Sequence, residues 1–85
     1  MTEKFTFSKH AKERMNSRGI SDTMIGNAIN NPDKIIVDAE CKRIYHKLLI
    51  EDQSEVLLRV FVNTCKKPAL VITAYKTSKI DKYEY

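Results

Sequence analysis

The sequence predicts an α+β fold in which two helices precede a meander of about four antiparallel strands. Apolar residues recur at helical spacing up to residue 31, whereas from residue 34 onward they alternate with polar residues as in strands. The turn-prone segments EDQSE and NTCKKP separate the alternating runs, which is consistent with antiparallel hairpins. At 85 residues the chain is expected to form a single domain, residues 1–85, with no room for a second domain that could hold a cofactor.

The N-terminal third contains the helix signals. Residues 4–7 alternate polar and aromatic side chains and could form a short first strand. Ser8 offers an N-cap hydroxyl for a helix over residues 9–18, and Gly19 stands where a helix C-cap belongs. A second helix is predicted over residues 22–31 and ends at an Asn-Pro pair. Because the link between the helices is short, we expect them to pack as a hairpin.

Alternation in the three longer strand segments predicts two different sheet faces. One face is aliphatic and should receive the helices. It includes Ile44, Leu48, Ile50, Val56, Leu58, Val60, Val62, Leu70, Ile72 and Ala74. The other face carries the basic and aromatic residues Arg43, Tyr45, Lys47, Arg59, Phe61 and Tyr75, together with Leu57, Val71 and Thr73. The same alternation puts His46 on the core side, where a buried histidine with a satisfied ring nitrogen is expected rather than a catalyst.

Interleaved basic and aromatic side chains on an open sheet face can pair with phosphates and stack on bases. We therefore predict RNA-binding residues on this face and just beyond it: Arg43, Tyr45, Lys47, Arg59 and Lys76. The alternative is a solvated outer face on which arginine and lysine stems cover apolar side chains.

Charge is distributed unevenly along the chain, whose net charge is +4. Residues 1–19 hold five basic and two acidic residues, and residues 64–85 hold the same numbers, so each end carries +3. The middle, residues 20–63, holds five basic and seven acidic residues and carries −2. A fold that brings the two ends together would create a positive surface that attracts phosphates.

Several classes of site and location are not indicated. Cys41 and Cys65 are far apart and outside any CxxC spacing, so neither a disulfide nor a zinc site is indicated, and two reduced thiols are expected. No apolar run is long enough to span a bilayer and no secretory h-region is visible, so a cytoplasmic protein that makes no membrane contact is expected. The sequence has no GxSxG, P-loop or dinucleotide motif and no metal-ligand spacing, so neither a cofactor nor a metal is predicted.

A stripe of one histidine and two arginines runs along the first predicted helix. His10, Arg14 and Arg18 are four residues apart and fall within about 80° on a helical wheel, beside the apolar Ala11 and Met15. Like charges at this spacing repel, so the stripe either pairs with acidic neighbours or awaits an anion. A guanidinium grips phosphate in two places, and an imidazole can give or take a proton near neutrality.

The segment HAKERMNSRGIS, followed by a second helix, NP, strands and a late LVITAY, resembles the DUF4258 family, which is commonly grouped with the RelE-like ribonuclease toxin superfold. The resemblance covers residues 7–77. It implies a helical hairpin packed on a curved antiparallel sheet, with the active cleft between the first helix and the sheet. The site residues it implies are His10, Arg14, Arg18 and Thr73, with Tyr75 and Lys76 beside them.

The predicted function is metal-independent RNA cleavage by a toxin-like endoribonuclease. His10 would act as base or acid, Arg14 and Arg18 would clamp the phosphate, Thr73 would contact a non-bridging oxygen, and Tyr75 would stack on a base or serve as a weak acid. RNA and an inhibitory antitoxin are the implied partners. Two alternatives remain open: a non-catalytic module that binds RNA or an acidic protein, and a structural protein whose arginines form internal ion pairs.

Overall fold

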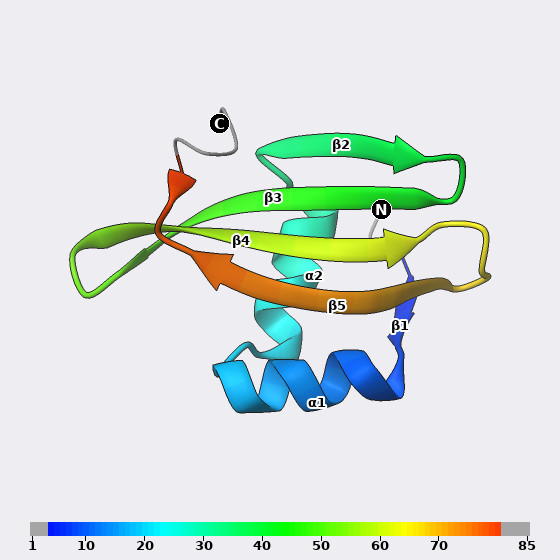
Figure 1. Ribbon diagram of the computed structural model, residues 1–85, viewed down its shortest axis with the longest axis horizontal. Helices are drawn as coiled ribbons and strands as arrows, with labels where there is room; N and C mark the ends of the chain where they lie inside the picture. The colour runs from blue at the N-terminus through cyan, green and yellow to red at the C-terminus, as the bar shows by residue number, and fades with distance from the viewer. Residues whose placement is uncertain (1–3, 81–85) are drawn as a thin grey trace.

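The computed structural model describes residues 4–80 and confirms the α+β class. Its elements, in chain order, are β1 (Phe5–Phe7), α1 (Lys9–Arg18), α2 (Asp22–Asn30), β2 (Lys34–Ala39), β3 (Lys42–Glu51), β4 (Ser54–Asn63) and β5 (Ala69–Thr77). The strands form one sheet in the order β1-β5-β4-β3-β2, with the two helices behind and beside it (Figure 1).

The sheet has five strands rather than about four, and it is mixed rather than antiparallel throughout. β2 to β5 pair as an antiparallel meander, as predicted. β1 pairs in parallel with β5, in a register that sets Phe5 opposite Ala69 and Phe7 opposite Val71. The chain passes through both helices between β1 and the meander, and the last strand of the meander returns to pair with β1.

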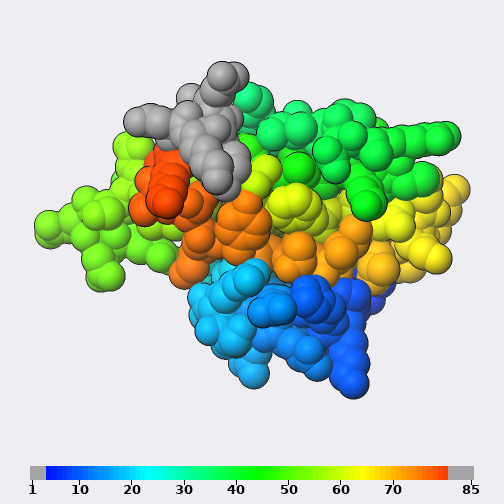
Figure 2. Space-filling view, in the orientation of Figure 1, coloured from blue at the N-terminus to red at the C-terminus, as the bar shows by residue number. Residues whose placement is uncertain are grey.

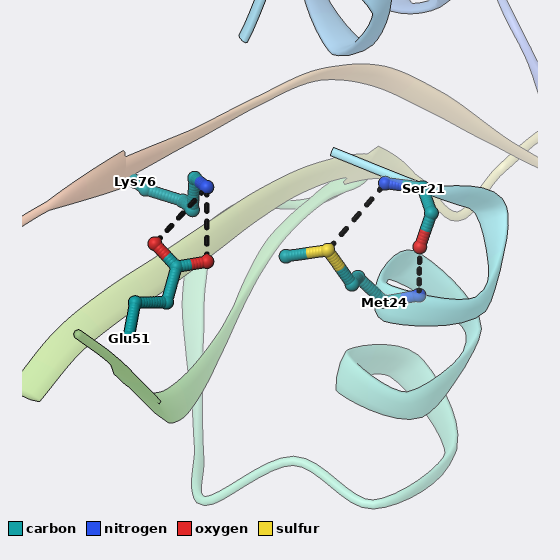
Figure 3. Close-up of polar contacts among 4 residues, drawn as sticks. All are labelled: Ser21, Met24, Glu51 and Lys76. Atoms are coloured by element: carbon teal, nitrogen blue, oxygen red, sulfur yellow. Dashed lines mark hydrogen bonds and ion pairs between the residues drawn. The ribbon is translucent and has the colours of Figure 1, made fainter. Parts of the chain in front are cut away.

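α1 spans the predicted residues 9–18, and α2 begins at the predicted residue Asp22 and ends at Asn30, one residue before the predicted end. The Ser8 hydroxyl accepts a hydrogen bond from the Ala11 amide at 3.0 Å, and Gly19 ends α1 with a left-handed φ of 67°. Ser21 caps α2 by accepting from the Met24 amide at 3.2 Å (Figure 3). The caps at Gly19 and Ser21 flank the short link between the helices and therefore set the directions in which the helices leave it.

The predicted helical hairpin is not what the structure shows. α1 lies along β5, whereas α2 passes behind β3 and β4, so each helix packs on the sheet separately (Figure 1). The space-filling view shows α1, in blue, directly beneath β5, in orange (Figure 2). Each helix buries its own small apolar stripe in the core, Ala11 and Met15 from α1 and Ile25, Ala28 and Ile29 from α2.

The core lies between the helices and one face of the sheet. Its buried members are Ala11, Met15, Ile20, Ile25, Ala28, Ile29, Tyr45, Leu58, Val60, Val62, Ala69, Val71 and Ala74. The prediction for β4 is confirmed, because Leu58, Val60 and Val62 face the helices together.

The prediction for β3 is wrong by one residue. Tyr45 is only 2% exposed and lies opposite Val60 in the core, whereas His46 lies opposite Arg59 on the other face. β3 carries apolar residues on both faces, so its own alternation does not decide its orientation. Pairing with β4, whose apolar face is unambiguous, sets the register.

A bulge in β5 explains a second difference. Val62 pairs with Val71 and Phe61 pairs with Thr73, so Ile72 is an extra residue between the two pairs. The bulge places both Val71 and Ala74 in the core, although simple alternation assigns them to opposite faces. Thr73 and Tyr75 keep the predicted face, away from the helices.

The two cysteines form a disulfide, so the prediction of two reduced thiols is wrong. Cys41 lies in the turn between β2 and β3, and Cys65 lies in the loop between β4 and β5. Antiparallel pairing of β3 with β4 brings these connections to one end of the sheet, where the two Cα atoms are 5.2 Å apart. The Thr64 amide also donates to the Cys41 carbonyl at 2.8 Å. Separation of 24 residues in sequence is therefore no barrier to pairing.

Neither helix found among residues 4–80 has the length and apolar character needed to cross a membrane.

Candidate functional site

α1 covers the edge of β5 that β1 leaves open. β1 pairs only with residues 69–71, so the carbonyl groups further along β5 need other donors. The Ser8 hydroxyl donates to the Ile72 carbonyl at 3.1 Å, and Arg18 Nη1 donates to the Ala74 carbonyl at 2.8 Å. Arg18 therefore anchors the end of α1 to the sheet, and its guanidinium lies beside β5 as a consequence.

The other two members of the predicted stripe point to solvent. His10 and Arg14 are exposed, and Arg14 Nε donates to His10 Nε2 at 3.4 Å. Within residues 4–80, no carboxylate lies within 4.0 Å of the side-chain nitrogens of His10, Arg14 or Arg18. The expected alternative, in which acidic neighbours neutralise the stripe, is therefore not realised in the described part of the chain.

A second basic and aromatic cluster lies on the sheet face opposite the core. Arg59 on β4 donates from Nη1 to the Tyr75 hydroxyl on β5. Its guanidinium carbon is 5.1 Å from the centroid of Phe61 and 5.5 Å from that of Tyr75, and the two rings stack with centroids 5.9 Å apart. The Arg18 guanidinium carbon is 6.0 Å from the Tyr75 ring centroid. Two positive charges from different elements thus lie around one phenol ring.

His46 supports this cluster, a role that the sequence analysis did not find. Its Nε2 accepts a hydrogen bond from Arg59 Nε at 3.0 Å, and the residue is 0% exposed. Burial lowers the pKa of His46 below 6.5, and the nearby charges of Arg59 and Lys34 lower it further. The imidazole is therefore held neutral, as an acceptor that orients Arg59. Only the β3–β4 register reveals this pair, because alternation within β3 places His46 on the wrong face.

The five residues predicted to bind RNA lie in different surroundings in the structure. Tyr45 is buried in the core and has no surface for stacking on a base, so this prediction is wrong for the physical reason given above. Lys47 donates to the Asn31 carbonyl at 2.9 Å. Lys76 forms an ion pair with Glu51 at 3.0 Å (Figure 3).

The remaining two predicted RNA-binding residues differ in setting. Arg59 belongs to the cluster with Tyr75 and Phe61, whereas Arg43 is exposed on β3. Thr73 and Arg43 line the same hollow, which has a volume of about 240 Å³ and is also bordered by Asp38 and Phe61. A separate open depression of about 440 Å³ is lined by Arg18, Tyr75 and Lys76. Thr73 and Arg18 thus line different hollows of the surface.

The described residues contain no group of three or more His, Cys, Asp or Glu side chains that could hold a metal ion. What the arrangement offers chemically is positive charge, a hydroxyl and exposed imidazole and guanidinium groups. These are the groups that bind phosphate by charge and hydrogen bonding.

Comparison with known proteins identifies a family for most of the chain. A family model described as Domain of unknown function (DUF4258) matches residues 7–76. No curated protein and no solved structure matches the chain.

Proposed function

The chain belongs to the DUF4258 family, a domain of unknown function, and from its own side chains we propose that it binds RNA and cleaves it without a metal ion. The proposal is supported by the exposed stripe of His10, Arg14 and Arg18 on α1, whose side-chain nitrogens have no carboxylate within 4.0 Å among residues 4–80. The Arg18 guanidinium carbon also lies 6.0 Å from the centroid of the Tyr75 ring. Like charges four residues apart on a helix repel each other, and a bound anion relieves this repulsion. Guanidinium groups suit the paired oxygens of a phosphate because they donate two parallel hydrogen bonds.

The proposed reaction is transfer of a phosphodiester to the neighbouring ribose hydroxyl. A base takes the proton of the 2′-hydroxyl, the 2′-oxygen forms a bond to phosphorus, and the bond from phosphorus to the 5′-oxygen breaks. An acid then gives a proton to the leaving 5′-oxygen, so the products are a 2′,3′-cyclic phosphate and a 5′-hydroxyl. Arg14 and Arg18 stabilise the charge on the non-bridging oxygens, whereas Thr73 lines a different hollow and is assigned no part in the reaction. His10 serves as the base and Tyr75 as the acid.

A second candidate is a non-catalytic module that grips RNA or an acidic protein with the same basic surface. One observation favours it: the lone pair of His10 Nε2 accepts a hydrogen bond from Arg14, and His46 is fully buried. In this arrangement neither imidazole offers a lone pair to a substrate. Cleavage therefore requires Arg14 to leave His10 for the phosphate, whereas simple binding does not.

The test is cleavage of a labelled single-stranded RNA in the presence of a chelator. The variants His10→Gln, Arg14→Gln and Tyr75→Phe each remove one proposed function, and Lys12→Gln removes one exposed positive charge from the same helix as a matched control. We expect each of the three to slow cleavage by about tenfold or more, which corresponds to about 1.4 kcal/mol, and the control to match the wild type. RNA that is bound but stays intact would favour the second candidate.

We further propose that the fold is of the RelE-like type and that the activity is that of a toxin held silent by an antitoxin. The succession of two helices and an antiparallel meander supports this view, as does the exposed basic stripe, which an acidic segment of a partner would cover. Expression in a bacterial host without the partner should slow growth, and His10→Gln should relieve the effect. Normal growth at high expression would contradict the toxin assignment.

A further inference from the structure

Two irregularities in strand pairing supply residues to one small hollow of the surface. In β2 the register with β3 shifts between Val37 and Ala39, so Asp38 is an extra residue there. In β5 the extra residue is Ile72. Asp38 and Ile72 both line the same hollow, which has a volume of about 240 Å³. A β-bulge redirects side chains and is common beside functional sites, so the meeting of two bulges at one hollow indicates a binding site.

The disulfide holds the end of the sheet at which this hollow lies. Cys41 directly precedes Lys42, which lines the hollow, and Cys65 lies in the loop that joins β4 to β5. The turn between β2 and β3 and the loop between β4 and β5 lie at the same end of the molecule (Figure 1). A covalent link between them fixes the backbone around the hollow, and a site that is fixed in advance loses less conformational entropy when a ligand binds.

Side chains on the face opposite the core converge on the hollow. Phe61 pairs with Ile44 on β3 and with Thr73 on β5, so these three side chains share one face of the sheet. Lys42 lies two residues before Ile44 and therefore faces the same way. Lys42, Phe61 and Thr73 all line the hollow. They bring an ammonium group, an aromatic ring and a hydroxyl to one place.

The charged groups at the hollow are not paired with one another. Lys42 and Asp38 are exposed, and within residues 4–80 neither forms an ion pair within 4.0 Å. Arg43 is also exposed and lines the hollow, so the cations outnumber the one carboxylate. A complementary ligand therefore offers an anionic group to the cations and a hydrogen-bond donor to the carboxylate of Asp38.

We propose that this hollow binds one pyrimidine nucleoside monophosphate. The phosphate binds Lys42 and Thr73, the ribose hydroxyls donate to Asp38, and the base lies against the ring of Phe61. A pyrimidine is favoured over the larger purine because the hollow is smaller than the roughly 300–1,000 Å³ typical of pockets for drug-sized ligands. None of these residues is assigned a part in the proposed RNA cleavage, so this inference is independent of it.

The test is a titration of the whole chain with uridine 5′-monophosphate, followed through the backbone amide signals in two-dimensional NMR. The nucleotide should shift the amides of Lys42, Phe61 and Thr73 at concentrations up to about 10 mM, which detects dissociation constants down to the weak millimolar range. It should bind at least about tenfold more tightly than uridine, inorganic phosphate or the dinucleoside phosphate UpU. Uridine and inorganic phosphate each lack one part of the ligand, and UpU exceeds the space of the hollow.

Substitutions at the hollow test the assignment of each group. Lys42→Gln should weaken binding of the nucleotide by about tenfold or more and leave the weaker binding of uridine unchanged, because uridine has no phosphate. Lys66→Gln removes the same charge from the neighbouring exposed loop, outside the lining of the hollow, and should bind the nucleotide like the wild type. Phe61→Leu should lower the affinity for the nucleotide to about that for ribose 5-phosphate. The amide spectrum of each variant checks that the fold is kept.

Four outcomes would overturn the proposal. These are the absence of shifts at the hollow, shifts confined to α1, inorganic phosphate that binds as tightly as the nucleotide, and a folded Lys42→Gln variant that binds it like the wild type. Binding of UpU as tight as that of the nucleotide would instead assign the hollow to an RNA strand and would also contradict the proposal.

Discussion

The buried imidazole of His46 makes the stability of the folded chain depend on pH. Unfolded, this histidine binds a proton with a pKa of about 6.5, whereas burial and the charges of Arg59 and Lys34 lower its pKa in the fold. Between the lowered value and 6.5 the unfolded state therefore binds more protons than the folded state. The stabilisation is fully present above pH 6.5 and is lost as the pH falls below it, at up to about 1.4 kcal/mol per pH unit.

The variant His46→Gln isolates this effect, because an amide oxygen can still accept the hydrogen bond of Arg59 but does not titrate. Between about pH 7.5 and about pH 5.5, wild type should lose up to about 1.4 kcal/mol more unfolding free energy than the variant. Urea unfolding followed by circular dichroism gives both values. Carboxylates are common to both chains, so their contributions cancel in the difference. An equal loss in the two chains, or a larger loss in the variant, would refute the reasoning.

Other substitutions test the structural roles of single residues, again by urea unfolding. Arg18→Gln weakens a charged hydrogen bond to the edge of β5 and should lower the free energy of unfolding by about 1–2 kcal/mol. The control Lys12→Gln should change it by less than about 0.5 kcal/mol. Equal changes in the two variants would contradict the anchoring role of Arg18. Tyr45→Ala should lower the free energy of unfolding by about 3–5 kcal/mol, and Tyr45→Phe by less than about 1.5 kcal/mol. An alanine variant as stable as the wild type would contradict the core position of Tyr45. Reducing the disulfide of Cys41 and Cys65 should cost about 3 kcal/mol, and insensitivity to reductant would contradict its formation.

The local signals in the sequence predicted the helices well, because caps and termination depend on neighbouring residues. The hydroxyls of Ser8 and Ser21 and the left-handed Gly19 act within one turn of the chain. The class of the fold followed from the change of apolar period near residue 34. The helix ends and the fold class are properties of short segments, so they can be predicted before the tertiary structure is known.

What the sequence did not predict depends on pairing between distant segments. β3 is apolar on both faces, so only its register with β4 shows that Tyr45 is buried and that His46 contacts Arg59. The bulge at Ile72 and the disulfide likewise require two strands to be aligned first.

In the candidate site, too, the features set by neighbouring residues were predicted, whereas the contacts between distant residues were not. The helical spacing of His10, Arg14 and Arg18 was visible in the sequence. The contact of Arg18 with the edge of β5 and the stacking of Tyr75 on Phe61 were not. These contacts join residues from opposite ends of the chain or from neighbouring strands. Within residues 4–80, α1 and β5, which belong to the two basic ends of the sequence, lie side by side.

The most direct test of RNA cleavage by attack of the 2′-hydroxyl uses one defined oligonucleotide, incubated with the purified chain in the presence of a chelator. The masses of the products are then measured. We expect fragments that end in a 2′,3′-cyclic phosphate and begin with a 5′-hydroxyl, and no cleavage where the 2′-hydroxyl at the cut is replaced by hydrogen. Intact RNA at full binding, or fragments with 3′-hydroxyl and 5′-phosphate ends, would contradict it.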